Sequence, residues 1–435
     1  MFTLALCIRS GIAASGWSQT YGGSGDDEAY SLVQTSDGGY ALAGYTNSFG
    51  AGSYDFSLVK TNSSGTMQWN QTYGGSDDDE AFSMIQTNDT GYALAGTTTS
   101  YGAGETDAWL VKTDSSGNMQ WSQTFGGRAQ DGAYSLIQTS DGGYALAGFT
   151  DSYGSGSYDF WLVKTNSSGS MQWNQTYGGT GDDEASCVVQ TSDGGYALAG
   201  YTNSFGAGSY DFWLVKTDSS GNMLWNRTYG GSGDDEAECV IQTGDGYAVA
   251  GYTNSTGAGG FDFWLVKTDF SGTSQWSQTY GGADDEAANA LLQTSDAGYA
   301  LAGWTGSYGA GGFDFWLVKT NSSGTMLWSQ TYGGGGDDAG FSLVQTSDGG
   351  YALAGFTGSY GAGDYDGFLV KTDSAGNSVI PQSSPFSIPY SAIIIVAIIV
   401  IIVIAAVVIA RRRRPRPGTP TVQQGPPADS GMKPT

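Results

Sequence analysis

The chain has 435 residues, with 42 acidic and 16 basic side chains, a formal charge of −26, three cysteines and no histidine. Without histidine there is no Ser-His-Asp or Cys-His nucleophile system and no imidazole-bound metal. Three cysteines are too few for a disulfide framework in a chain of this length. The acidic charge also argues against nucleic acid as a partner, because phosphate contacts need Lys and Arg.

The N-terminal residues and the long acidic region that follows differ sharply in composition. Residues 1–16 hold a short apolar run followed by small residues, and we interpret them as a weak or truncated signal-like segment. Residues 17–390 carry 41 acidic and 9 basic side chains. All nine prolines lie at or beyond Pro381, so residues 378–390 are predicted to be a stalk rich in Pro and Ser. The proline-free, glycine-rich stretch before them fits many strands joined by tight turns.

The segment 391–410 is uncharged and almost entirely apolar. As a helix, the nineteen apolar residues Ala392–Ala410 reach about 28 Å, close to the ~30 Å of a bilayer's hydrocarbon core. A basic, Pro-rich tail follows at 411–435 and begins with four consecutive arginines. By the positive-inside rule the tail is cytoplasmic and the preceding residues lie outside. We therefore predict a single-pass protein of the cell membrane.

Tryptophan recurs every 52 residues, apart from one interval of 51, at Trp17, Trp69, Trp121, Trp173, Trp225, Trp276 and Trp328. Each unit divides into four runs rich in aromatic and β-branched residues, separated by Gly, Asn, Asp and Ser turns. No run shows the long 3.6-residue period of a helix. Four strands in about 50 residues, repeated, are typical of a β-propeller blade.

The repeats also predict how the ring closes. The series begins with a fourth strand at Trp17 and ends with a third strand near Lys371. We predict an all-β, seven-bladed propeller of four-stranded antiparallel blades over residues 17–377, closed by the N-terminal strand and followed by one transmembrane helix. An open solenoid is the alternative, but it leaves an unpaired edge at each end and needs capping repeats.

The repeat motif resembles a known family. The run YGG-x-G-DDEA, the turn SDGGYALAG, the strand YDFWLVK and the turn DSSGNMLW are similar to the SBBP-type β-propeller repeat, across residues 17–380. With its C-terminal anchor, the chain also resembles archaeal membrane-anchored surface propellers. The resemblance implies a secreted or surface-anchored repeat domain and no defined reaction.

An acidic loop joins the fourth strand of one blade to the first strand of the next. Carboxylates in Gly-rich loops suit Ca²⁺, although such side chains also bond to their own turn backbone. The candidate metal ligands are Asp26, Asp27, Glu28, Asp78, Asp79, Glu80, Asp182, Asp183, Glu184, Asp234, Asp235, Glu236, Asp284, Asp285, Glu286, Asp337 and Asp338. The loop between the second and third strands should share this face and adds Asp55, Asp159, Asp211, Asp262, Asp314 and Asp366.

Other residues recur once per blade. A lysine ends each third strand, and we expect one structural ion pair per blade with the Asp of the SDGG turn. The repeated tryptophans are expected to pack between blades. The aromatic residues beside the glycine loop are better candidates for ligand contact: Tyr54, Tyr158, Tyr210, Phe261, Phe313 and Tyr365. Cys187 and Cys239 occupy the same place in neighbouring blades, and free thiols are favoured over a disulfide.

Eight N-x-S/T sequons are candidate glycosylation sites on an exported chain. They are Asn62, Asn70, Asn88, Asn166, Asn174, Asn226, Asn254 and Asn321. Asn-Ser-Ser-Gly is also ordinary turn chemistry, so this interpretation and the structural one both stand.

These features favour a membrane-anchored cell-surface propeller that binds an extracellular protein or polysaccharide, or mediates adhesion, with Ca²⁺ as a candidate stabilising ion and no other cofactor. A purely structural envelope module without a small ligand is the alternative. An extracellular carbohydrate-active enzyme is the weaker hypothesis, because catalysis needs an unequal pair of carboxylates and the blades repeat the same loop. We therefore do not expect an enzyme.

Overall fold

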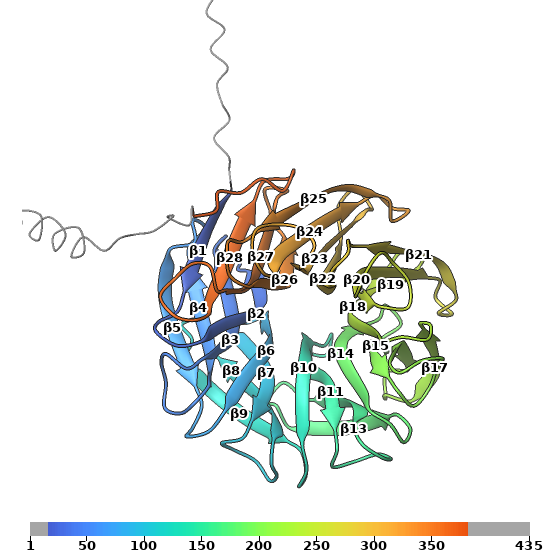
Figure 1. The fold of residues 1–435 in the computed structure, drawn as a ribbon. Coiled ribbons are helices and arrows are strands. Elements are labelled where there is room, and N and C mark those ends of the chain that lie inside the picture. Colours follow the sequence, from blue (N-terminus) through green and yellow to red (C-terminus); the bar gives the residue numbers. More distant parts are fainter. Residues whose placement is uncertain (1–15, 382–435) are drawn as a thin grey trace, which may run out of the picture. The chain divides into compact units, whose positions relative to one another are not determined.

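The computed structural model describes residues 16–381, which form 28 strands in seven four-stranded antiparallel sheets. The sheets are arranged as the blades of a ring (Figure 1). Blade 1 is β2 to β5, blade 2 is β6 to β9, and so on to blade 7, which joins β26, β27 and β28 to the N-terminal β1. The predicted seven-bladed propeller is confirmed, and so is its closure by the N-terminal strand.

The first strand of each blade lies innermost, beside the first strands of both neighbouring blades. The first strands are β2 (Asp27–Gln34), β6 (Asp79–Gln86), β10 (Asp131–Gln138), β14 (Asp183–Gln190), β18 (Asp235–Thr243), β22 (Glu286–Gln293) and β26 (Asp338–Gln345). The second strands are β3 (Tyr40–Thr46), β7 (Tyr92–Thr98), β11 (Tyr144–Thr150), β15 (Tyr196–Thr202), β19 (Gly246–Thr253), β23 (Tyr299–Thr305) and β27 (Tyr351–Thr357).

The outer half of each blade completes the sheet. The third strands are β4 (Asp55–Thr61), β8 (Asp107–Thr113), β12 (Asp159–Thr165), β16 (Asp211–Thr217), β20 (Asp262–Thr268), β24 (Asp314–Thr320) and β28 (Asp366–Thr372). The fourth strands are β5 (Met67–Tyr73), β9 (Met119–Phe125), β13 (Met171–Tyr177), β17 (Met223–Tyr229), β21 (Ser274–Tyr280), β25 (Met326–Tyr332) and β1 (Trp17–Tyr21). In Figure 1 the dark-blue β1 lies beside the orange β28, and the two pair from Trp17–Lys371 to Tyr21–Gly367.

The second and third strands are buried on both faces because each blade is covered by its two neighbours. This explains why YALAG and DFWLV do not alternate with polar residues: every position of β12 and β16 is buried. The fourth strands are less buried, and they expose Met and Gln at the outer rim, as in β5. The apolar core is therefore a set of clusters between blades.

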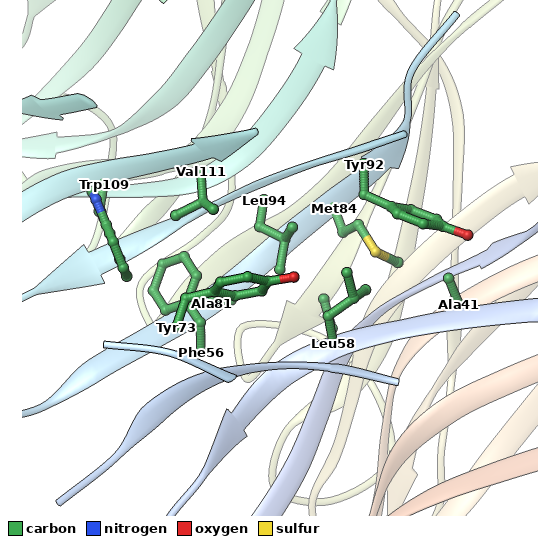
Figure 2. Close-up of a cluster of buried hydrophobic side chains, with 11 residues drawn as sticks. Ala41, Phe56, Leu58, Tyr73, Ala81, Met84, Tyr92, Leu94, Trp109 and Val111 are labelled. Atoms are coloured by element: carbon green, nitrogen blue, oxygen red, sulfur yellow. The ribbon is translucent and has the colours of Figure 1, made fainter. Parts of the chain in front are cut away.

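Figure 2 shows one such cluster between blades 1 and 2, with Leu58 from β4 close to Met84 of β6. Phe56 meets Trp109 of the next blade with ring centroids 4.7 Å apart. The fourth-strand tryptophans also cross the junction, for example Trp69 against Tyr92 at 6.0 Å. The predicted role of the tryptophans in packing between blades is confirmed.

The predicted ion pairs are also confirmed. In each blade the lysine that ends the third strand contacts the aspartate of the turn between the first two strands, at 2.7–3.0 Å. Lys60 is buried and its Nζ also donates to the Thr61 carbonyl at 2.7 Å. Partial burial of Asp37 acts in the opposite direction, but hydrogen bonds from Thr35 and Lys60 lower its pKa to about 2. The pairs lie on the face opposite the acidic loops, and each one holds the turn between the first two strands against the third strand.

The boundary of the propeller lies beyond the predicted residue 377. The Ser378 hydroxyl donates to the carbonyls of Trp17 and Lys371, and Ser18 donates to the Val379 carbonyl. Ile380 packs against the core between blades 6 and 7. The first residues of the predicted stalk, 378–380, therefore belong to the closing blade of the propeller.

The predicted signal-like segment, most of the stalk, the membrane span 391–410 and the tail 411–435 lie outside the described residues. Within residues 16–381, no helix is long and apolar enough to cross a membrane.

A small polar residue on the first strand fastens neighbouring blades at the channel wall. The hydroxyl of Ser31 accepts from the Met84 N–H at 3.0 Å, and Ser83, Ser135 and Ser342 do the same to their neighbours. Blades 4, 5 and 6 have Cys187, Cys239 and Ala290 at this place. The two thiols are free, as expected, with sulfurs 4.0 Å apart.

Cys187→Ser should therefore stabilise the propeller. The new hydroxyl would accept from the Val240 N–H as Ser135 accepts from Val188 at 3.1 Å, which is worth roughly 0.5–1.5 kcal/mol. Urea unfolding measures the gain, with Cys187→Ala as the control that removes the thiol without adding an acceptor. Equal midpoints for the two variants would contradict the prediction.

Candidate functional site

The acidic loops and the glycine loops share one face of the ring, as predicted. The Asn47 N–H donates to the Asp26 carbonyl at 3.0 Å, and the Asp79 N–H donates to the Tyr54 carbonyl at 2.8 Å. The second bond crosses from blade 1 to blade 2. This acidic face surrounds the mouth of the central channel.

The middle carboxylate of each acidic triplet is buried and holds the loop together. Asp27 accepts from the hydroxyls of Thr46 and Ser48 and, at 2.7 Å, from the Gly23 N–H. Its equivalents are Asp79, Asp131, Asp183, Asp235, Glu286 and Asp338, each the first residue of its strand. Protein donors reach the carboxylate of Asp27 and of its equivalents, although Oδ1 of Asp338 has no hydrogen-bond partner among the described residues, so this position has a structural role.

The triplet of blade 6 is one residue out of step with the others. Glu286 pairs with Thr305 as Asp235 pairs with Thr253, so Glu286 takes the place of the buried aspartate. Its carboxylate accepts from Thr305 and from the Gly282 N–H. The loops of blades 5 and 6 both have five residues, 230–234 and 281–285, but the Asp-Asp-Glu run begins one position earlier in blade 6. The grouping of Asp284–Glu286 with the other triplets was therefore wrong in register.

The first and third carboxylates face different surroundings. Asp26, Asp78, Asp182, Asp234, Asp285 and Asp337 lie in the loops at the surface, where blade 3 has Gln130 instead. Glu28, Glu80, Glu184 and Glu236 lie within the first strands, toward the channel, where blades 3, 6 and 7 have Gly132, Ala287 and Ala339. Burial raises the pKa of Glu28, and the hydroxyls of Tyr45 and Tyr30 offset part of that rise.

The three members of each triplet therefore lie in three environments: the first at the loop surface, the second buried under the loop and the third toward the channel. Among residues 16–381, no group of three or more Cys, Asp or Glu side chains is arranged to hold a metal ion. The calcium hypothesis stays a prediction. If Ca²⁺ binds the native loops, a concentration about 100 times its Kd adds roughly 2.7 kcal/mol of stability.

Thermal melting of the full-length chain in Ca²⁺, Mg²⁺ and EDTA at matched ionic strength tests the calcium hypothesis. If the hypothesis is right, the Tm should rise to a plateau as Ca²⁺ is added and should not rise with Mg²⁺ or EDTA. The same Tm in all three solutions would refute it.

The aspartates that start the third strands are also structural. The Asp55 carboxylate accepts from Ala51 and Gly52 of its own glycine loop at 2.9 and 3.2 Å. It also lies against Gly74, where an added Cβ would come 2.0 Å from Asp55 and 2.8 Å from Asp79. This close approach explains the first glycine of YGG. Asp107 has the same place in blade 2, which the sequence motif did not identify because its loop reads ETDAW.

The pKa values of several of these carboxylates are raised, because the groups are buried and lie close to other carboxylates. Burial, and then the Asp338 charge, raise the pKa of Asp314 to about 6. The pKa values of Asp107, Asp159, Asp211 and Asp262 are raised for the same reasons.

A ring of seven side chains lines the channel, and sequence analysis missed it. Each first strand has a β-bulge, and the residue at the bulge points into the channel. The ring comprises Tyr30, Phe82, Tyr134, Ser186, Glu238, Asn289 and Phe341 around a cavity of about 430 Å³. Bulges commonly aim side chains into functional sites.

The ring breaks the sevenfold repetition of the blades. Phe341, Tyr30, Phe82 and Tyr134 form a continuous aromatic arc, with successive ring centroids 4.4, 5.3 and 5.3 Å apart. Blades 4, 5 and 6 supply Ser186, Glu238 and Asn289 instead, and we call these three residues the polar arc. Aligning the repeats on this one position would have shown the difference.

Glu238 is the acidic member of the polar arc. Burial in the channel wall, followed by the charge of Glu236, raises its pKa to about 8, and the Ser186 hydroxyl offsets part of that rise. A strongly shifted acid in a cavity is typical of functional sites.

A second cavity of about 350 Å³ opens between blades 5 and 6, and we call it the blade 5/6 cavity. It is lined by Glu238, Tyr252, Phe261, Asp285, Ala287, Asn289 and Trp304. Ala287 leaves this space because the other blades with an intact triplet have a glutamate there. The Tyr252 hydroxyl donates to Glu236 at 2.5 Å, which holds that carboxylate beside the cavity.

Aromatic pairs stand around the channel mouth, as expected for the residues beside the glycine loops. Tyr54, Tyr158, Tyr210, Phe261, Phe313 and Tyr365 each pack on an aromatic residue near the end of a second strand, with centroids 4.4–5.1 Å apart. Phe261 lines the blade 5/6 cavity, while Phe313 packs on Trp304. Their role in ligand contact remains a prediction.

The sequons have different surroundings. Asn70, Asn88, Asn226 and Asn254 are exposed. Asn62, Asn166 and Asn321 accept hydrogen bonds inside their own turns, and Asn174 accepts from the Trp161 indole at 3.2 Å. Glycosylation remains a prediction for all eight.

No protein-family model matches the chain, so the SBBP resemblance also remains a prediction. The chain is similar to the regulatory protein FlaEY of Caulobacter vibrioides, at 25% identity over 176 residues, which cover 35% of this chain and 18% of that protein. The match therefore spans less than a fifth of that relative.

Similar solved structures include the Pan2 WD40 domain of Neurospora crassa, with a TM-score of 0.48 and 10% identity over 82% of this chain and 91% of that one. Sqt1 of Chaetomium thermophilum has a TM-score of 0.47 and 13% identity over 87% and 89% of the two chains. The extracellular domain of a hybrid two-component system of B. thetaiotaomicron has a TM-score of 0.47 and 11% identity, over 84% of this chain and 44% of that one.

Proposed function

We propose that the chain is a membrane-anchored cell-surface propeller that binds an extracellular protein or polysaccharide at the mouth of its central channel. The observation that carries this proposal is the contrast between scaffold and channel. The buried carboxylates that start the first strands and the lysine ion pairs recur in all seven blades. The side chains at the bulges, in contrast, differ from blade to blade. Uneven side chains around a cavity are what a binding site requires of a symmetric fold.

Anchoring at the membrane rests on the apolar segment 391–410 and the arginines after it. A binding role is favoured over catalysis because the repeated buried aspartates are engaged by backbone and hydroxyl donors, as Asp27 is by Gly23 and Ser48. A structural envelope module without a small ligand is the competing function. It needs no open cavity at the channel mouth, so the two proposals respond differently to substitutions there.

Surface exposure and binding are tested together in cells that express the full-length chain. Protease added outside should cleave a tag before residue 17 and spare a tag after residue 435. Trp304→Ala should weaken retention of envelope material, while Phe270→Ala, a similarly large change at an exposed residue on the opposite face, should not. Equal retention by both variants would favour the structural module.

A further inference from the structure

We infer that the blade 5/6 cavity binds an organic ammonium ion. This inference rests on the proposed function, because it names the ligand class of the same site. It follows from three features of the cavity: the aromatic side chains, the carboxylates and the absence of a basic residue in its lining.

The aromatic wall comes from both blades. Tyr252 and Phe261 of blade 5 and Trp304 of blade 6 line the cavity, and all three are half-buried, so part of each ring is open to the cavity. Trp304 is held by Phe313, with centroids 4.4 Å apart, and Tyr252 by Phe261, at 5.1 Å. Rigid aromatic faces attract ammonium groups through their quadrupoles, and several faces around one cation are the usual arrangement.

The carboxyl groups of the cavity have no basic partner in its lining, and its negative charge grows as Glu238 ionises. Glu238 and Asp285 line it, and Glu236 lies next to it on the Tyr252 hydroxyl. No Lys or Arg lines the cavity. In the described part of the chain, the seven lysines contact turn aspartates on the opposite face. Arg227 lies over the Trp225 ring on an outer strand, and Arg128 lies in the loop of blade 3. A bound cation would supply the missing positive charge.

Size and lining distinguish an ammonium ion from other ligands. An anion would meet like charges, and a small metal ion would meet aromatic carbon where it needs oxygen ligands. A neutral sugar would leave Asp285, and Glu238 once it is ionised, without a positive partner. A volume of about 350 Å³ holds a small organic cation and at least part of what is attached to it.

Calorimetry on the full-length chain in a neutral maltoside detergent tests the inference with choline and with its neutral isostere 3,3-dimethylbutan-1-ol. Choline should bind in the millimolar range or tighter, and the neutral alcohol at least about tenfold more weakly. At about pH 9, where Glu238 is ionised, Trp304→Ala and Glu238→Gln should each weaken choline binding about tenfold. The controls Phe356→Ala, at the place of Trp304 in blade 7, and Glu80→Gln, at the place of Glu236 in blade 2, should change it less than about twofold.

Choline keeps its charge at every pH, so the pH dependence reports on the site. Glu238 faces Glu184 and Cys187 of β14, Tyr134 of β10, Tyr252 of β19, and Glu236 and Cys239 of its own strand. Affinity should rise from about pH 6 to about pH 9 as Glu238 ionises. Glu238→Gln should flatten this part of the rise, because that variant cannot ionise there.

Equal binding of choline and the neutral alcohol, or unchanged choline binding in Trp304→Ala, would overturn the inference. Absence of choline binding would do the same. If retention of envelope material still depends on Trp304 while choline does not bind, the ligand class is wrong and the binding site stands. If neither depends on Trp304, both proposals fail. A melt of each variant shows that it is folded, and Glu238→Gln is expected to melt above the wild type.

Discussion

Glu238→Gln should stabilise the propeller by about 3–5 kcal/mol at about pH 9, by about 1–2 kcal/mol at about pH 6, and hardly at all at about pH 4. The pKa of Glu238 is raised from 4.5 in the free side chain to about 8 in the folded protein. Between these two values the folded state holds a proton that the unfolded state has lost. The contribution of Glu238 to the wild-type free energy of unfolding therefore falls by about 1.4 kcal/mol per pH unit as pH rises, and it levels off above the folded pKa.

Glutamine has the shape of the protonated acid and does not titrate, so its advantage should follow the same curve with opposite sign. Urea unfolding at constant ionic strength and three pH values measures it. Asp284→Asn is the matched control, because Asp284 is exposed on the neighbouring loop and water solvates its charge in both states. A constant difference between Glu238→Gln and wild type at all three pH values would contradict the assignment.

Trp213→Ala should destabilise the propeller by about 3–5 kcal/mol. Trp213 is 1% exposed, and it meets Phe160 of the preceding blade with centroids 4.5 Å apart. Truncation leaves a cavity between blades 3 and 4, where the side chain is buried between the two sheets. Urea unfolding at neutral pH gives the loss.

The junction between blades 7 and 1 provides the opposite test. There the aromatic pair is missing, because Ser57 takes the place of the tryptophan and Gly367 that of the phenylalanine. A small cavity of about 70 Å³ lies beside them. Ser57→Trp should fill it and gain about 1–2 kcal/mol. The control Ser57→Ala, which fills nothing, should stay near wild type, and a loss of stability in Ser57→Trp would show that the junction cannot accept the ring.

The spacing of tryptophan predicted the ring because a 52-residue unit with four strand-like runs leaves few other architectures. The lysine–aspartate pairs were equally accessible, since both partners recur at fixed places in every unit. The repeats did not show, however, that the members of the acidic triplet have different roles. Adjacent residues of a strand point to opposite faces, so Asp27 is buried under its loop while Glu28 turns toward the channel.

Two features of the site depended on register, which the repeats alone do not give. In blade 6 the Asp-Asp-Glu run begins one position earlier in a loop of the same length, which puts Glu286 in the buried position and Ala287 beside the cavity. The bulge between Ala237 and Cys239 shifts the register of β18 at Glu238, so the repeats alone did not identify which residue lines the channel. Variation at this position among otherwise similar repeats was the one available signal in the sequence.

The proposed binding site lies on the polar side of the channel mouth and does not extend over the propeller face as a whole. The most direct test measures retention of envelope material by full-length variants changed at equivalent places in different blades. We predict that Trp304→Ala and Glu236→Gln, in blades 6 and 5, reduce retention at least about tenfold, while Phe356→Ala and Glu80→Gln, in blades 7 and 2, leave it within about twofold. Equal effects in all four variants, or none in any, would contradict the claim.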